Sequence, residues 1–112
     1  MSTEEQQSME HLQLTEQALQ NLVMQKQVFQ LDGLETSNAL EEIKKKKDDE
    51  VYKIIGSVMF KANKEDLVKE LEKKSEMLNL RMKAIEKQEE QLKNQLLKVR
   101  EQILKKAKVE KK

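Results

Sequence analysis

The fold is decided by the stretch Val51-Tyr52-Lys53-Ile54-Ile55-Gly56-Ser57-Val58-Met59-Phe60-Lys61, the only part of the chain rich in β-forming residues. Gly56-Ser57 fits a two-residue loop, in which glycine supplies the positive φ of a type II′ turn. That turn would pair Ile55 with Val58, Ile54 with Met59 and Lys53 with Phe60. The stretch therefore predicts a β-hairpin over about residues 51–62.

Both faces of this predicted hairpin are apolar. In this pairing one face carries Val51, Ile55, Val58 and Phe60, and the other carries Tyr52, Ile54 and Met59. A lone hairpin is marginal in water, and its unpaired strand edges favour pairing with other chains. We therefore expect these seven residues to form an assembly surface.

Helical periodicity flanks the hairpin on both sides, over about residues 9–47 and about residues 64–108. The first seam is Leu12, Thr15, Leu19, Leu22, Lys26, Phe29, Gly33, Thr36, Leu40 and Ile43, with six of ten positions apolar. The second is Val68, Leu71, Ser75, Leu78, Met82, Ile85, Glu89, Leu92, Leu96, Val99 and Ile103, with nine of eleven apolar. A heptad sustained over this length predicts a coiled coil. Asn63 is the expected N-cap of the second helix.

The hairpin reverses the chain, so the two helices are expected to pair antiparallel within one domain spanning residues 1–112. The seams match in length when Leu19 shares a layer with Leu92 and Leu40 shares one with Leu71. Lys26 and Glu89 then fall in neighbouring layers, where they could form an ion pair. Two chains zipping in parallel is the less favoured alternative. The predicted fold class is mainly α: an antiparallel two-helix coiled coil with a central β-hairpin.

Composition excludes several classes of protein. Charged residues make up 38% of the chain and aromatic residues 3%, with no proline and no tryptophan, which is typical of a coiled coil. A net charge of +1 provides no field that would attract nucleic acid or a membrane surface. No apolar run approaches the roughly 20 residues that span a bilayer. The absence of cysteine fits a reducing compartment, and we expect a cytoplasmic location.

Catalytic, cofactor and metal sites find little support. His11 has no cysteine, aspartate or second histidine near it, and we interpret it as a solvated helix residue. Asp48-Asp49-Glu50 lacks the turn and glycine of a hard-cation site, so a solvated linker is the better interpretation. The Lys44–Lys47 run could contact nucleic acid, but cations that end a helix explain it more simply. We therefore expect a protein that is not an enzyme and uses no cofactor or metal.

Apolar residues off the seam gather at the far ends of both predicted helices: Leu14, Val23, Met24, Leu97 and Leu104. The seam itself weakens beyond Leu12 and Val99, because Ser8 would face Ile103. We expect these ends to fray and to expose Met9, Leu12, Val99, Ile103 and Leu104. Scattered surface apolar residues are normal, but such a cluster favours a binding surface. The basic stretch of residues 105–112 is either a solvated helix end or a contact for an acidic partner.

The order of helix, hairpin and helix resembles the beta class of prefoldin subunits over nearly the whole chain. The most specific matches are Gln25-Lys26-Gln27, Ala39-Leu40-Glu41-Glu42, Val51-Tyr52-Lys53-Ile54-Ile55-Gly56, Lys64-Glu65-Asp66-Leu67, Leu80-Arg81, Ile85-Glu86-Lys87-Gln88-Glu89 and Leu92. A single hairpin is typical of the beta class rather than the alpha class.

The resemblance implies a chaperone subunit in a hexamer of two alpha and four beta subunits, whose hairpins join into a β-barrel. It also implies that the coiled-coil tips hold unfolded proteins without ATP and deliver them to a group II chaperonin. The tip residues would be Met9, Leu12, Leu14, Val23, Met24, Leu97, Val99, Ile103 and Leu104. The alternative is a structural coiled-coil tether or a tubulin-cofactor-like binding protein without general chaperone activity.

Overall fold

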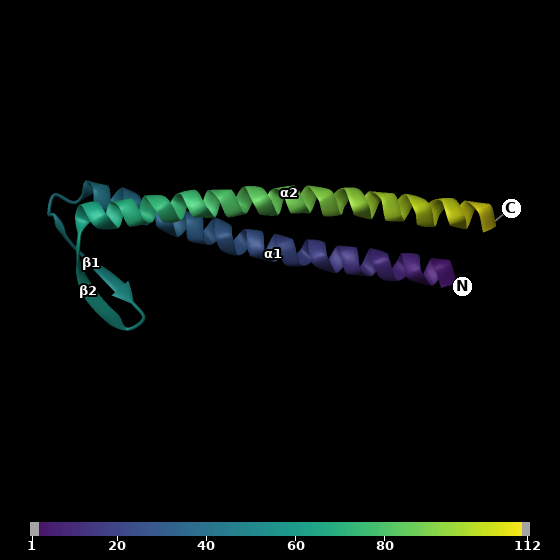
Figure 1. The fold of residues 1–112 in the computed structure, drawn as a ribbon, viewed down its shortest axis with the longest axis horizontal. Helices are drawn as coiled ribbons and strands as arrows, with labels where there is room; N and C mark the ends of the chain where they lie inside the picture. Colours follow the sequence, from purple (N-terminus) through teal and green to yellow (C-terminus); the bar gives the residue numbers. More distant parts are fainter. Residues whose placement is uncertain (1–2, 111–112) are drawn as a thin grey trace. The chain divides into compact units, whose positions relative to one another are not determined.

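The computed structural model describes residues 3–110, and the elements follow the predicted order. Figure 1 shows helix α1 (Thr3–Lys45), strands β1 (Glu50–Ile55) and β2 (Val58–Asn63), and helix α2 (Lys64–Glu110). Helix α1 begins at Thr3 rather than near Met9. Its first turn carries Glu4 and Glu5, and negative charge near a helix N-terminus is stabilising. The predicted fold class is confirmed for the single chain.

The hairpin has the predicted register. The strands pair antiparallel from Glu50 with Asn63 to Ile55 with Val58, and they form a two-stranded sheet. Gly56 has a φ of 61°, and it is the only described residue with a positive φ. A type I′ turn would need a positive φ at Ser57 as well, so the loop is the predicted type II′ turn.

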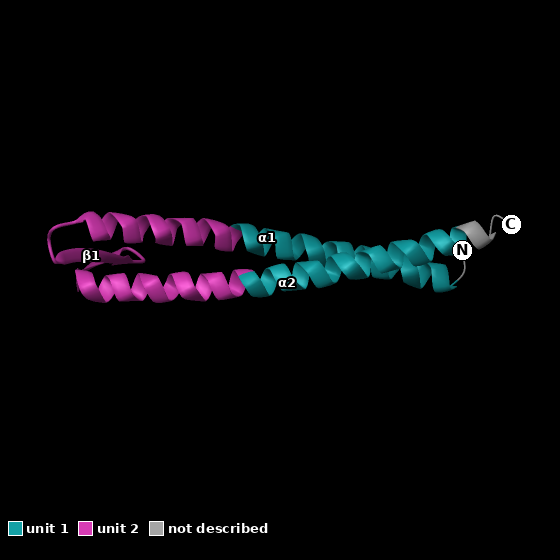
Figure 2. Ribbon diagram, turned by 90° about the horizontal axis from the view of Figure 1, so that it is seen from above, with its two compact units in different colours: residues 1–27, 83–112 teal, residues 28–82 magenta. Residues whose placement is uncertain are grey.

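The chain forms two compact units, coloured separately in Figure 2. The first unit contains residues 1–27 and 83–112, and its described part is a pair of antiparallel helical segments. Its core consists of Thr15, Ile85, Glu89, Leu96 and Val99. All five are predicted seam positions, so the heptad identified the buried face of both segments in this unit.

The second unit contains residues 28–82, that is, the end of α1, the hairpin and the start of α2. Its buried residues are Thr36, Val51, Leu67 and Leu78. The antiparallel direction is visible in two contacts between the helices. The Lys74 ammonium lies 3.1 Å from the Asp32 carboxylate, and the Arg81 guanidinium lies 5.8 Å from the centre of the Phe29 ring. From the first contact to the second, the residue number falls in α1 and rises in α2, as it must for antiparallel helices.

The hairpin is joined to the helices through its base. The Lys64 backbone N–H donates to the Asp49 carbonyl at 2.9 Å, and the Lys64 ammonium donates to the Lys46 carbonyl. The Asn63 side chain accepts a hydrogen bond from the Glu65 backbone N–H at 2.9 Å, which confirms Asn63 as the N-cap of α2. Strand β2 ends at Asn63 and α2 begins at Lys64, so the hairpin base is joined to the start of α2 without a linker.

Two threonines occupy core positions without leaving an unpaired hydroxyl. Thr15 and Thr36 donate their hydroxyl groups at 2.8 Å to the carbonyls of His11 and Asp32, one turn earlier in α1. A buried hydroxyl without a partner would be costly, and here the helix itself supplies the acceptor. Each threonine therefore fills a seam layer as a small side chain.

Over residues 3–110, neither helix has an apolar segment long enough to cross a bilayer.

Glycine is used differently at its two positions, and this predicts opposite effects of alanine. A Cβ built on Gly33 would meet no atom within 4 Å apart from its chain neighbours and the backbone of its own helix, and Gly33 has a helical backbone. Gly33→Ala should therefore raise the free energy of unfolding by about 0.5–1 kcal/mol. Gly56→Ala should lower it by about 1–2 kcal/mol, because alanine is strained at a φ of 61°. Urea unfolding followed by circular dichroism tests both variants, and a destabilising Gly33→Ala would show that glycine is needed there.

Candidate assembly and binding surfaces

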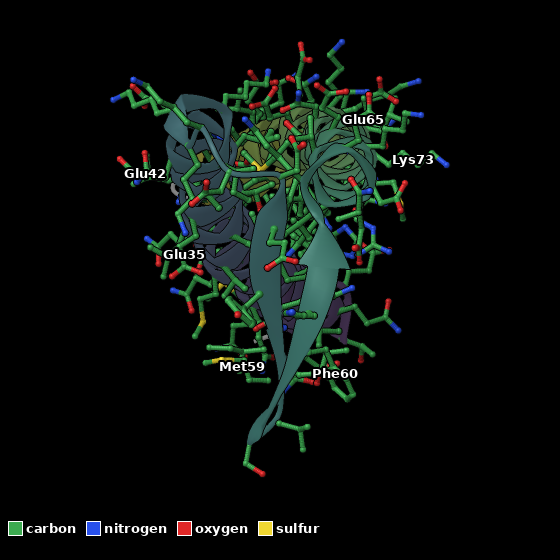
Figure 3. The ribbon with its side chains drawn as sticks, turned by 90° about the vertical axis from the view of Figure 1, so that its left-hand side faces the viewer. Glu35, Glu42, Met59, Phe60, Glu65 and Lys73 are labelled. Carbon is green, nitrogen blue, oxygen red and sulfur yellow. The ribbon has the colours of Figure 1, made fainter. Side chains whose placement is uncertain are left out.

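The hairpin presents apolar side chains on both faces beyond its base. Six are exposed in the single chain: Tyr52, Ile54, Ile55, Val58, Met59 and Phe60. We call this set the hairpin surface. In Figure 3, Met59 and Phe60 lie on opposite sides of the ribbon near the turn. Within residues 3–110 both edges are unpaired, since each strand has only the other as a neighbour there. Exposed apolar faces and free edges together favour contact with other chains.

Val51 was predicted to belong to this surface, but the single chain already covers it. Its side chain is only 3% exposed, because it lies at the base, where the hairpin meets the helices. Lys53 is on the same face of the hairpin and forms an ion pair with Glu70 of α2. On the opposite face, Lys61 lies 3.6 Å from Glu50. The hairpin is therefore attached at its base and exposed towards its turn, which periodicity could not show.

A second group of exposed apolar residues lies on the first unit, where the chain begins and ends. Its members are Met9, Leu14, Val23, Met24, Leu97 and Leu104. We call this set the tip surface. The other three predicted tip residues lie elsewhere in the unit. Val99 is 7% exposed and belongs to the core, whereas Leu12 and Ile103 are half-buried on the seam.

The expectation that the helix ends fray is wrong for the described residues. Helix α1 is regular from Thr3 onwards, and α2 is regular up to Glu110. Two ion pairs join the ends, Lys106 with Glu4 at 3.4 Å and Arg100 with Glu16 at 3.3 Å. Both pairs join exposed side chains, and surface ion pairs of this kind add little stability, so they accompany the regular helix ends rather than cause them.

A shallow cleft lies between the helix ends, and its lining is polar rather than apolar. The residues around it are Glu4, Gln7, Ser8, His11, Val99, Gln102 and Lys106. None of the apolar residues of the tip surface lines this cleft. Among the described residues no group of three histidine, cysteine, aspartate or glutamate side chains could hold a metal ion.

Some exposed apolar residues were not predicted. In the second unit α1 exposes Val28, Leu31 and Leu34, and α2 exposes Met77 and Leu80. They could have been found in the sequence as apolar residues outside the two heptad seams. They make useful controls, since they resemble the tip surface in chemistry and lie in the other unit.

Comparison with known proteins identifies the class to which this arrangement belongs. A family model described as "Prefoldin subunit" matches residues 6–110. The chain belongs to the prefoldin subunit family. Prefoldin subunit beta of Thermococcus kodakarensis is 41% identical over 93 residues, covering 82% of this chain and 80% of that protein. Prefoldin subunit beta of Methanosarcina acetivorans is 39% identical with the same coverage.

The fold of prefoldin beta subunits also matches. The crystal structure of the prefoldin beta subunit from Thermococcus strain KS-1 has a TM-score of 0.82, with 38% identity. The match covers 91% of this chain and 90% of that one. The resemblance to the beta class is confirmed. Prefoldin subunits are chaperone subunits and form hetero-oligomers with other prefoldin subunits, so this chain has a chaperone-subunit fold.

Proposed function

We propose that this chain is an ATP-independent holdase subunit that assembles through its hairpin and binds unfolded proteins with its tip surface. The proposed complex contains two alpha and four beta subunits, with the hairpins joined into a β-barrel. It would act in the cytoplasm without catalysis and would deliver its clients to a group II chaperonin. These details extend the family assignment to partners, clients and location.

The observation that supports this proposal best is the hairpin surface. A chain that is 38% charged exposes six large apolar side chains on 14 residues of hairpin, on both faces. Burying them in an assembly would gain roughly 25 cal/mol per Å² of apolar area, whereas leaving them in water favours aggregation. A coiled-coil tether would need no such element. The tip surface, in the other unit, would remain available for clients.

An aggregation assay tests the proposal. The chain is mixed with an alpha-class prefoldin subunit, and a chemically unfolded client is diluted into the mixture without nucleotide. Light scattering by the client should fall to near the level of buffer at a stoichiometric amount of complex, since several weak tip contacts act together. Each subunit alone at the same total concentration is the control. A complex that assembles but leaves client scattering unchanged would favour the tether instead.

A further inference from the structure

A charged layer interrupts the apolar core of the first unit. Glu89 is only 7% exposed and lies on the α2 seam between the buried side chains of Ile85 and Leu96. Its Oε1 atom is 3.2 Å from the ammonium of Lys26 on α1. Its Oε2 atom is 4.0 Å from the ammonium of Lys93, one turn further along α2. Lys26 is itself half-buried, so this ion pair crosses the interior of the coil.

Stability does not account for this polar layer, by which we mean Lys26 and Glu89. Removing two charges from water costs about as much as their attraction returns, and apolar replacements of such pairs are often neutral or stabilising. In coiled coils the established role of a charged or amide residue at a core position is to specify partner and register. The relevant question is therefore which wrong pairings this layer disfavours.

The most competitive wrong pairing is between two copies of α2. Nine of its eleven seam positions are apolar, so two copies of α2 could pair as a coiled coil, and a parallel pair would keep every apolar layer in register. In such a coil both copies of Glu89 would occupy one core layer, which places two carboxylates together out of water. Lys93 would not offset this repulsion, because its side chain is 61% exposed and its charge is screened by solvent.

A parallel pair of α1 helices would likewise bring two copies of Lys26 into one core layer, which places two ammonium groups together. Only the pairing of α1 with α2 brings opposite charges together. We propose that the Lys26–Glu89 ion pair is a pairing-specificity element that keeps α1 with α2 and disfavours a parallel coiled coil with the same helix of a second copy.

A single cysteine gives a direct probe of wrong pairing, because the chain has none of its own. Leu92→Cys places a thiol on the α2 seam, where the same position of a second copy would meet it only in an α2–α2 coil. The probe is placed in three backgrounds: native, Lys26→Leu with Glu89→Leu, and Lys26→Glu with Glu89→Lys. Each chain is refolded by dilution from denaturant and oxidised, and the disulfide between chains is measured on non-reducing gels.

The doubly apolar chain should form at least about ten times as much of this disulfide as the native-background chain. Its melting temperature should equal or exceed that of the native-background chain. The charge-reversed background should stay at the native level, because it restores the α1–α2 attraction and keeps α2–α2 repulsion. Equal disulfide in all three backgrounds would overturn the proposal, since the hairpin connection alone would then decide the pairing.

A mixing experiment decides the matter even if the doubly apolar variant folds poorly. The Glu89→Lys chain carries lysine at both positions, and the Lys26→Glu chain carries glutamate at both. Leu19→Cys is added to the first and Leu92→Cys to the second. Refolded together, they should form several-fold more mixed disulfide than native-background chains with the same two probes, because α1 of each then fits α2 of the other. A mixed yield no higher than in the native background would contradict the proposed specificity.

Discussion

Ile54→Lys combined with Val58→Lys is expected to abolish assembly with an alpha-class subunit while leaving both helices folded. Ile54 and Val58 point to opposite faces of the hairpin, and they are 67% and 51% exposed in the single chain. A lysine there is harmless in water, but a contact between subunits would bury its charge without a partner. Each such burial costs several kcal/mol, so the variant should lose at least about a thousandfold in affinity.

Size-exclusion chromatography with light scattering measures this loss, and far-ultraviolet circular dichroism reports the helices. Leu80→Lys is the matched control, since Leu80 has the same 67% exposure but lies on α2. The control should assemble as the native chain does. If the hairpin variant still formed the full complex, the assembly surface would have to lie on the helices.

The second large effect is expected at the tip surface. Leu14→Gln, Leu97→Gln and Leu104→Gln together should leave the complex intact but remove most of its ability to suppress client aggregation. All three side chains are exposed, so the substitutions create no cavity and the coil should keep its stability. In the proposed complex several tips would bind one client at once, so weakening the four tips that this chain contributes would be multiplied across the complex.

The matched control moves the same number of substitutions into the other unit. Leu31→Gln, Met77→Gln and Leu80→Gln change residues of similar exposure on the same two helices. Client scattering is measured for both variants, after light scattering has shown that each forms the complex. Equal protection by the tip variant and the native chain would place client binding elsewhere, for example along the coil.

Much of the fold could be predicted because its signals are local. The two-residue turn at Gly56-Ser57 fixes the strand register, and the heptad identifies the buried face of both helical segments in the first unit. In the second unit Leu67 is buried although the seam predicted Val68. The pairing of Lys26 with Glu89 could also be anticipated, since matching the two seams from the hairpin outward brings both residues to adjacent layers. These features depend on the turn residues of the hairpin and on a helical period of three to four residues that the chain follows closely.

The rest depends on contacts between segments that are distant in sequence. Val51 is buried because it lies where the base of the hairpin meets the helices, and the order of residues along a strand does not encode that contact. The ion pair of Lys106 with Glu4 joins residues about a hundred positions apart, and no local pattern predicts it. Val99 was expected both on the seam and among the exposed tip residues, and it lies in the core, as the seam predicts.

Native mass spectrometry of the chain mixed with an alpha-class prefoldin subunit measures directly whether the hairpin drives assembly. We expect one dominant complex whose mass equals two alpha and four copies of this 13.2 kDa chain. The same mixture made with the Ile54→Lys and Val58→Lys variant should show only free subunits. A native mixture that contains free subunits alone, or a complex that survives both lysines, would contradict assembly through the hairpin.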